Sequence, residues 1–257
     1  MMRNYACVLL IAVSTLCSSC AGIQSAKNAA AAIPYPVGYD LTSEGASSYE
    51  NCGDHADSPY FLHPDYFAMK STDTLTIITG YKTYQQSTEY TCGPAAILTV
   101  LNHYGNTDWD ELKIAQEAGT NSDVGTTPIQ VADFFTRLGW TVRSSVTEGV
   151  NEGGATFTEY DDFKAWVISS LKSDEPILVD WLDWGGHWQA VIGYDTMGTE
   201  EGADDVLILA DPYDTSDQWQ DGYYTFPAER FYWMWREGDP ENPDKAEQPW
   251  VIAVPSK

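Results

Sequence analysis

Basic side chains are scarce in this sequence. Lysine and arginine total 13 against 38 aspartates and glutamates, which gives a formal net charge of −25. A protein that binds a nucleic-acid backbone or anionic lipid headgroups needs a basic face. We therefore expect no nucleic-acid partner and no membrane docking through a basic patch, and we interpret the acidic excess as a solvated surface.

Long apolar runs are missing after the first 20 residues, so no later segment is expected to cross a membrane. At the start, Arg3 precedes the short apolar stretch ACVLLIAVSTLC, and the small residues Ser18 and Ser19 lead to Cys20. This arrangement is typical of an export signal and resembles the lipoprotein type, in which cleavage leaves a lipidated cysteine. We predict a signal peptide over 1–19 and an exported protein, anchored in the cell envelope through lipid on Cys20. Ordinary cleavage nearby, which would give a secreted protein, is the alternative.

Cysteine is also rare, with five residues in the chain. Cys7 and Cys17 belong to the predicted signal and Cys20 to its lipid anchor, so only Cys52 and Cys92 remain in the folded part. An exported domain can join two such cysteines in a disulfide. A Cys52–Cys92 disulfide is therefore the alternative to any chemical role for Cys92.

The rest of the chain divides by composition. Residues 20–36 are low in complexity and predict a tether. Residues 37–73 are rich in Gly, Ser, Asp and Tyr without a sustained period, and they predict an irregular arm. The remaining residues, 74–257, predict one domain.

Helices are predicted mainly in the first half of this domain and strands in the second. Apolar spacing and terminal residues such as Thr107, Thr127 and Gly139 predict helices over 93–104, 107–119, 127–139 and 158–174. Short β-branched runs predict strands over 73–81, 140–147, 175–182, 186–195, 205–212 and 249–255. Residues 222–236 predict a strand followed by a short aromatic turn. This segregation predicts an α+β fold, with N-terminal helices packed on a C-terminal antiparallel sheet.

Cys92 begins the first of these helices, in the stretch TCGPAAILTVLNHYG. A thiolate, not a thiol, is the nucleophile, and a helix N-terminus favours the thiolate through its dipole and free N–H groups. This position makes Cys92 a candidate nucleophile. Such a nucleophile needs a nearby base, which holds the ion pair and later protonates a leaving amine.

Histidine offers few candidates for that base, because the chain has four. His103 lies near the far end of the same helix, and His55 and His63 lie in the predicted arm. His187 opens a predicted strand after two glycines, which allow close approach of another group. We therefore select His187 as the candidate base.

A catalytic histidine needs a partner that fixes its tautomer. Asp211 ends the strand that follows the one opened by His187, so a hairpin of these strands would place the two side chains next to each other. Gln86, six residues before Cys92 in a predicted loop, could join the backbone N–H of Cys92 in an oxyanion hole. Gln85 is the alternative donor.

Three motifs in this order, QSTEYTCGPA, GGHWQAVIGYD and LADPYD, resemble the papain-like cysteine peptidases of the bacteriocin-processing, double-glycine leader type, and above all their stand-alone relatives. The resemblance covers residues 75–257. It implies a papain-like α+β fold, with Cys92 as nucleophile, His187 as base, Asp211 as its orienter and Gln86 as oxyanion donor. The transporter relatives carry a membrane domain and an ATPase, neither of which is found here, so leader-peptide specificity is not carried over.

The sequence thus predicts a cysteine peptidase that hydrolyses peptide or amide bonds of a peptide or protein substrate through a thioester, without a cofactor. An acyl transferase or transpeptidase with the same residues, and an inactive cell-surface binding module, are the alternatives. The candidate residues of the substrate cleft are Gly93, Gly186, Trp184 and Trp188. For the tryptophans, packing in the core is the competing interpretation.

Two further clusters contain side chains of the kind that bind metals. The spacing of the first matches no usual zinc site, and the second lacks the order of a calcium-binding EF-hand loop. We therefore predict no metal at either cluster. The first consists of Cys52, His55, Asp57 and His63, and the second of Asp211, Asp214, Asp217 and Asp221.

Overall fold

A computed structural model describes residues 30–49, 55, 57–146, 157–181, 183–235 and 248–256. The predicted signal peptide over 1–19, the lipidation site Cys20 and the possible disulfide partner Cys52 lie outside the described residues. Among the helices that the structure does describe, none is long and apolar enough to span a membrane.

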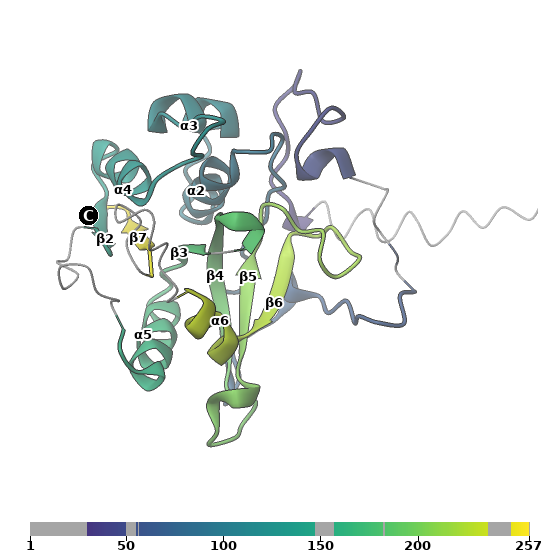
Figure 1. Ribbon diagram of the computed structural model, residues 1–257, viewed down its shortest axis with the longest axis vertical. Coiled ribbons are helices and arrows are strands. Elements are labelled where there is room, and N and C mark those ends of the chain that lie inside the picture. The colour runs from purple at the N-terminus through teal and green to yellow at the C-terminus, as the bar shows by residue number, and fades with distance from the viewer. Residues whose placement is uncertain are drawn as a thin grey trace, which may run out of the picture.

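A seven-stranded antiparallel sheet forms the centre of the fold, with the order β2-β7-β3-β4-β5-β6 and with β1 also paired to β4 (Figure 1). Along β4, strand β3 pairs with the first residues and β1 with the last three, while β5 pairs along the other edge. Strand β4 is therefore paired on both edges, and it is buried from His187 to Tyr194. The strands are β1 (Leu75–Ile77), β2 (Thr141–Ser144), β3 (Ile177–Trp181), β4 (His187–Asp195), β5 (Val206–Ala210), β6 (Tyr223–Pro227) and β7 (Trp250–Val254).

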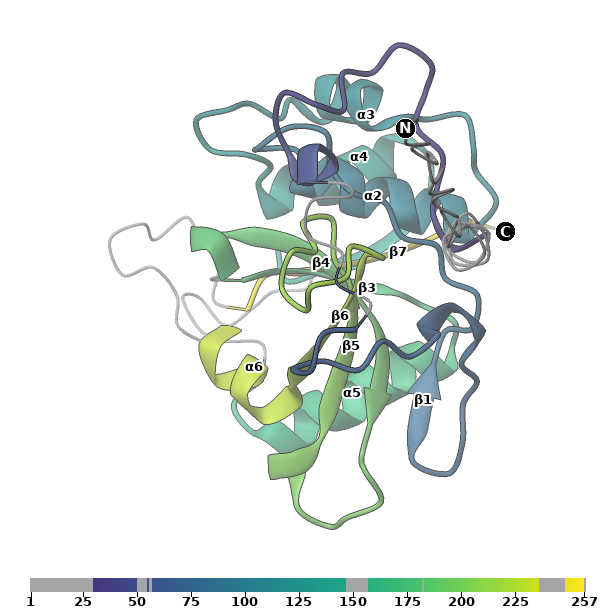
Figure 2. The same cartoon turned by 90° about the vertical axis from the view of Figure 1, so that its right-hand side faces the viewer.

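The helices α2, α3 and α4 lie together at one end of the sheet, and α5 and α6 lie towards the other end (Figures 1 and 2). Helix α2 contacts both β4 and α3, and it is buried from Gly93 to Leu101. The predicted α+β class, with helices packed on an antiparallel sheet, is confirmed. The helices are α2 (Cys92–His103), α3 (Glu111–Ala118), α4 (Pro128–Arg137), α5 (Tyr160–Lys172) and α6 (Ala228–Trp235).

Two predicted elements differ from the structure. Helix α3 begins after Asp110 and not after Thr107, because the Asp110 side chain accepts the backbone N–H of Lys113 and caps the helix. The predicted aromatic turn at the end of 222–236 is the helix α6, of eight residues. Its buried residues, Ala228, Phe231, Tyr232 and Trp235, recur with helical spacing, which favours a helix over a turn.

The described part of the N-terminal segment packs on the loop that precedes α2. Ile33 N–H donates to the carbonyl of Thr83 at 2.8 Å, and Ser47 N–H donates to the carbonyl of Gln86 at 3.1 Å. Gly45 has a positive φ and lies so close that a Cβ there would be 2.5 Å from the Ser87 carbonyl carbon. The end of the predicted tether over 20–36 and the start of the predicted arm are therefore docked against the domain. The arm also contains short 3-10 helices at Ala46–Tyr49 and Tyr66–Ala68.

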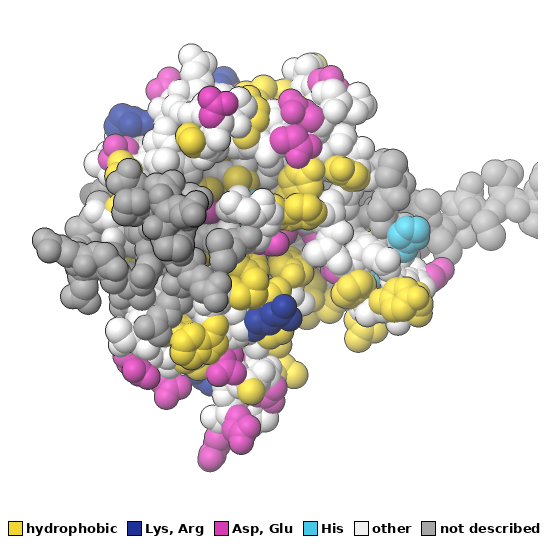
Figure 3. Space-filling view, viewed as in Figure 1, with side chains coloured by type: hydrophobic (Ala, Val, Ile, Leu, Met, Phe, Trp, Pro, Cys, Tyr) yellow, Lys and Arg dark blue, Asp and Glu magenta, His cyan; other side chains and the backbone are white. Residues whose placement is uncertain are grey.

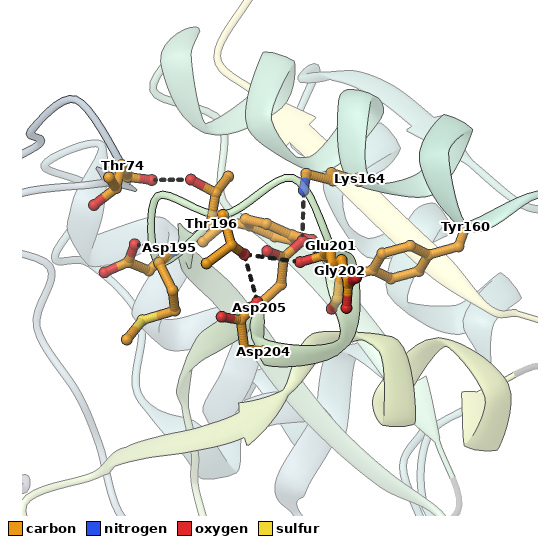
Figure 4. Close-up of polar contacts among 12 residues, drawn as sticks. Thr74, Tyr160, Lys164, Asp195, Thr196, Glu201, Gly202, Asp204 and Asp205 are labelled. Atoms are coloured by element: carbon orange, nitrogen blue, oxygen red, sulfur yellow. Dashed lines mark hydrogen bonds and ion pairs between the residues drawn. The ribbon is translucent and has the colours of Figure 1, made fainter.

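A buried polar network lies at the end of the hairpin where β4 ends and β5 begins (Figure 4). Lys164 of α5 pairs with the Asp205 carboxylate at 2.7 Å, and Asp205 is fully buried. The hydroxyls of Tyr194 and Tyr160 also donate to Asp205 Oδ2, at 2.5 and 3.1 Å. This network ties α5 to the end of the hairpin that is remote from His187.

Candidate active site

Cys92 is the first residue of α2, and it is a free, half-buried cysteine. As the first helical residue it has a backbone N–H without an acceptor inside the helix. No acidic side chain lies in the first turn to oppose the positive end of the helix dipole. The start of α2 therefore offers a sulfur atom and N–H groups that can stabilise negative charge.

Thr126, in the loop before α4, joins the start of α2 to the start of β4. A Cβ atom at Gly93 would lie 2.6 Å from Thr126 Oγ1, so the helix and the threonine can be this close only because residue 93 is glycine. The carbonyl of Thr126 accepts the indole N–H of Trp188 at 2.8 Å. Since Trp188 follows His187, this bridge ties the start of α2 to the part of β4 where His187 lies.

His187 and Asp211 meet across the β4–β5 hairpin, as the hairpin register predicted. His187 Nε2 lies 2.6 Å from Asp211 Oδ1, and both side chains are almost completely buried. The backbone N–H of Tyr213 also donates to Asp211 Oδ1, at 2.8 Å. The carboxylate is therefore held in place from two sides.

Electrostatics favour the charged form of His187. Burial lowers the pKa of the imidazole, but the charge and hydrogen bond of Asp211 outweigh it, and the neighbouring Cys92 side chain adds to them. The pKa of His187 is consequently raised well above its ordinary value of 6.5. Because Asp211 occupies Nε2, Nδ1 is the ring nitrogen left for Cys92. This arrangement provides a cation beside the sulfur and a proton that can be transferred.

Gln86 and Gln85 have different tasks in the loop before α2. Gln86 is buried and donates from Nε2 to the carbonyl of Thr88 at 2.7 Å, which leaves a second N–H on the same nitrogen. Gln85 donates from Nε2 to the carbonyl of Asp211 at 2.7 Å and accepts from Asp214 N–H at 3.1 Å. Gln85 is therefore held on residues 211–214 through both its amide nitrogen and its amide oxygen, whereas Gln86 is held through its nitrogen alone.

A buried carboxylate that the sequence did not reveal holds this loop. Glu111, the first residue of α3, accepts hydrogen bonds from the backbone N–H of Ser87 at 2.9 Å and from the hydroxyls of Ser87, Thr91 and Tyr84. Burial raises the pKa of Glu111 despite these donors. In the sequence Glu111 has only the pattern of an ordinary acidic first-turn residue, so no local signal identifies it.

Asp214 and Asp183 are two further carboxyl groups near the His187–Asp211 pair. Burial raises the pKa of Asp214 well above its usual range, and the charge of Asp211 raises it further. Burial also raises the pKa of Asp183, with His187 opposing and Asp211 reinforcing that shift. Among the described residues, no group of three or more His, Cys, Asp or Glu side chains is arranged to hold a metal.

The remaining predicted cleft residues lie at different depths. Trp188 is buried, whereas Trp184 is exposed and adopts a left-handed backbone with φ of 55°. Gly186, also exposed, has φ of 133°, a conformation that side chains with a Cβ rarely adopt. The turn before His187 is therefore an exposed edge of the site.

The other histidines lie elsewhere. His103, at the end of α2, lies 3.3 Å from a carboxylate oxygen of Asp174. His63 packs against the ring of Trp219. His55, in the described part of the arm, donates its backbone N–H to the carbonyl of Gln218.

An α+β domain with a cysteine at a helix start, facing a buried histidine–aspartate pair, has the geometry of a cysteine hydrolase. Residues 78–239, more than half of the chain, match the Peptidase_C39 like family, and the chain belongs to this family. The family predicted from the three motifs is thereby confirmed.

Several solved structures resemble the chain at low sequence identity. The peptidase domain of Streptococcus ComA, a bi-functional ABC transporter involved in a quorum sensing pathway, is 19% identical with a TM-score of 0.44, over 68% of this chain and 99% of that one. A double glycine motif protease from an AMS/PCAT transporter, solved with a leader peptide, is 15% identical with a TM-score of 0.38, over 68% and 91%. UfSP from C. elegans is 13% identical with a TM-score of 0.42, over 71% and 34%. None of the curated proteins matches the chain by sequence.

Proposed function

We propose that this chain is a cysteine peptidase in which Cys92, His187, Asp211 and Gln86 act together on a peptide or amide bond. Membership of a peptidase family supports the general class. One observation carries the finer proposal: the buried His187 imidazole bonds Asp211 through Nε2 while the Cys92 side chain adjoins the same ring.

The chemistry follows from these positions. Cys92 Sγ attacks the carbonyl carbon of the scissile bond, and the backbone N–H of Cys92 and the spare N–H of Gln86 stabilise the oxyanion. His187 gives its proton to the leaving amine, which breaks the C–N bond and leaves a thioester on Cys92. His187, now neutral, takes a proton from water as the water attacks the thioester. The C–S bond then breaks, which releases the acid product and restores the Cys92 thiolate.

The same residues can also transfer the acyl group to an amine, which makes acyl transfer the second candidate. The two are separated by the product formed in H₂¹⁸O with an added amine such as glycinamide. A hydrolase puts ¹⁸O in the new carboxylate, whereas a transferase gives the glycinamide conjugate. A binding module gives neither product, and it does not need a cationic histidine next to a free thiol.

The direct test is cleavage of a mixed peptide library, with products identified by mass spectrometry. We expect cleavage by the wild-type protein and none by Cys92→Ala. An electrophilic activity probe should label Cys92 in the wild type. Products from Cys92→Ala at the wild-type rate would disprove the proposed nucleophile.

We further propose that the protein is exported and held in the cell envelope by lipid on Cys20, without any other membrane contact. The basis is the sequence Ser18-Ser19-Cys20 after a short apolar stretch. Mass spectrometry of detergent-extracted protein should find a diacylglyceryl group on Cys20, and Cys20→Ala should release the protein from membranes. A mature N-terminus at another residue, without lipid, would contradict this proposal.

A further inference from the structure

Three aromatic side chains adjoin the proposed catalytic residues, and we refer to Tyr49, Trp184 and Tyr213 as the aromatic patch. The ring of Tyr213 lies 5.5 Å from the ring of Trp184 on one side and 6.3 Å from the ring of Tyr49 on the other. Trp184 is 69% exposed and Tyr49 is 47% exposed. The three rings come from the N-terminal segment, the β3–β4 turn and the loop after β5, so three distant parts of the chain build one surface.

The patch is fixed to the proposed catalytic residues at both ends. The backbone N–H of Tyr213 donates to the same Asp211 oxygen that binds His187. The hydroxyl of Tyr213 donates to Glu89 at 3.1 Å, and Glu89 lies three residues before Cys92. Trp184 lies three residues before His187, and its side chain is exposed to solvent. We therefore expect a substrate chain that reaches Cys92 to pass close to these rings.

Negative charge borders the patch. Glu89 lies at the Tyr213 hydroxyl, and Asp183 precedes Trp184 and is close enough to His187 and Asp211 to interact with their charges. In the described part of the chain, neither Glu89 nor Asp183 forms an ion pair with a lysine or arginine. Figure 3 shows hydrophobic side chains gathered over the upper parts of β4, β5 and β6, with acidic side chains among them.

Exposed aromatic faces next to carboxylates that pair with no lysine or arginine of the described residues form a surface that suits an organic cation. A lysine or arginine side chain can lay its apolar stem on the rings and its charge over their faces, and the carboxylates add direct attraction. An uncharged aliphatic side chain of the same length gains only the apolar contact. The net charge of −25 also raises the encounter rate with basic peptides.

We propose that the aromatic patch is a substrate subsite for a lysine or arginine side chain next to the bond that Cys92 attacks. This inference rests on the proposed peptidase function, because it assigns a substrate class to the same site. It predicts selection of basic peptides through contacts on Tyr49, Trp184, Tyr213 and Glu89.

Binding to the Cys92→Ala protein tests the inference without requiring catalysis. The probes are acetylated, amidated hexapeptide mixtures in which one position is fixed as Lys, norleucine or Glu and the others are mixed. We expect the best Lys mixture to bind roughly 2- to 30-fold more tightly than its norleucine counterpart, the range of a cation–π contact. Equal affinity of Lys and norleucine at every position would overturn the inference.

Two variants locate the preference. Trp184→Ala and Glu89→Gln, each combined with Cys92→Ala, should reduce the Lys preference, whereas Trp233→Ala, at an exposed tryptophan of α6, should keep it. A Lys preference that survives in both Trp184→Ala and Glu89→Gln would also refute the inference, because the cation would then bind elsewhere.

Catalysis is measured separately, by cleavage of the same mixtures with the wild-type protein. Selective binding without cleavage would contradict the peptidase proposal and leave the cation subsite standing. Cleavage of the Lys and norleucine mixtures at equal rates would support the peptidase proposal and contradict the cation subsite.

Discussion

The β4–β5 hairpin carries a buried carboxylate–cation pair at each end, and the two pairs serve different purposes. At one end Asp211 lies 2.6 Å from His187, and at the other Asp205 lies 2.7 Å from Lys164 (Figure 4). Both carboxylates are almost fully buried. Burial of an ion pair is therefore not what distinguishes a candidate active site.

The difference lies in the cation and in its neighbours. An ammonium group keeps its charge near neutral pH, whereas an imidazole can give up a proton there. At the Lys164 end, the hydroxyls of Tyr160 and Tyr194 both donate to Asp205 Oδ2 and hold the carboxylate in place. At the His187 end, the next group is the thiol of Cys92 at a helix start. We infer that the Asp205–Lys164 pair stabilises the fold and that the Asp211–His187 pair takes part in the proposed chemistry.

The largest expected effect comes from removing the histidine. His187→Ala should lower kcat/KM on a cleaved peptide by roughly 10²- to 10⁴-fold, the contribution typical of a general acid–base. Because the raised pKa of His187 keeps a cation beside the sulfur, Cys92 should react with iodoacetamide at mildly acidic pH. In His187→Ala this reaction should shift to alkaline pH.

Peptide mapping after brief alkylation provides the control for this prediction. Cys52, with no predicted helix start or base beside it, should be labelled little at mildly acidic pH. A native Cys52–Cys92 disulfide, with no alkylation of either cysteine before reduction, would defeat the assignment of Cys92 as nucleophile.

The next effect separates the two adjacent glutamines. Gln86→Ala should lower kcat by about 100- to 1000-fold, as loss of one oxyanion donor does, without moving the pH profile. Gln85→Ala should lower activity less but should shift the pH profile, because it frees the Asp211 carbonyl and the Asp214 N–H that Gln85 holds. If Gln85→Ala shows the larger loss and Gln86→Ala leaves the pH profile and the rate intact, Gln85 is the oxyanion donor.

A smaller effect tests which carboxylate orients the base. Asp211→Asn should lower kcat/KM by roughly 10-fold, since an amide oxygen still accepts from Nε2 but no longer raises the pKa of His187. The alkaline limb of the pH–rate profile, where His187 loses its proton, should also move towards neutral pH. Asp214→Asn should cost clearly less, because the raised pKa of buried Asp214 makes a neutral amide a close substitute. Equal losses would show that the wrong carboxylate was chosen.

Features that depend on local sequence pattern were predictable, whereas contacts between residues far apart in the chain were not. A helix start identified Cys92, and two strands in succession placed Asp211 beside His187, so their proximity was predictable; their catalytic roles remain predictions. The link from Gln85 to Asp211 joins residues 126 positions apart, and the link from Trp188 to Thr126 spans 62. Nothing in the sequence around Gln85 or Thr126 indicates these contacts. The same limit applies to helix ends, because Thr107 and Asp110 are both residue types that cap helices and the sequence pattern alone did not select Asp110.

The smallest expected effect on activity comes from breaking the other end of the hairpin. Asp205→Asn removes the charge that balances Lys164 but keeps an oxygen for the hydroxyls of Tyr160 and Tyr194. The free energy of unfolding should fall by about 3 kcal/mol, because a partly buried ammonium is left without its carboxylate. Urea unfolding at neutral pH measures this loss, with Asp204→Asn on the exposed loop as a control expected to change stability by less than about 0.5 kcal/mol. The kcat/KM of folded protein, counted by titration of Cys92, should remain at the wild-type value. A large loss of kcat/KM at full Cys92 titration would show that the two ends of the hairpin are coupled and that the Lys164 pair is more than a structural lock.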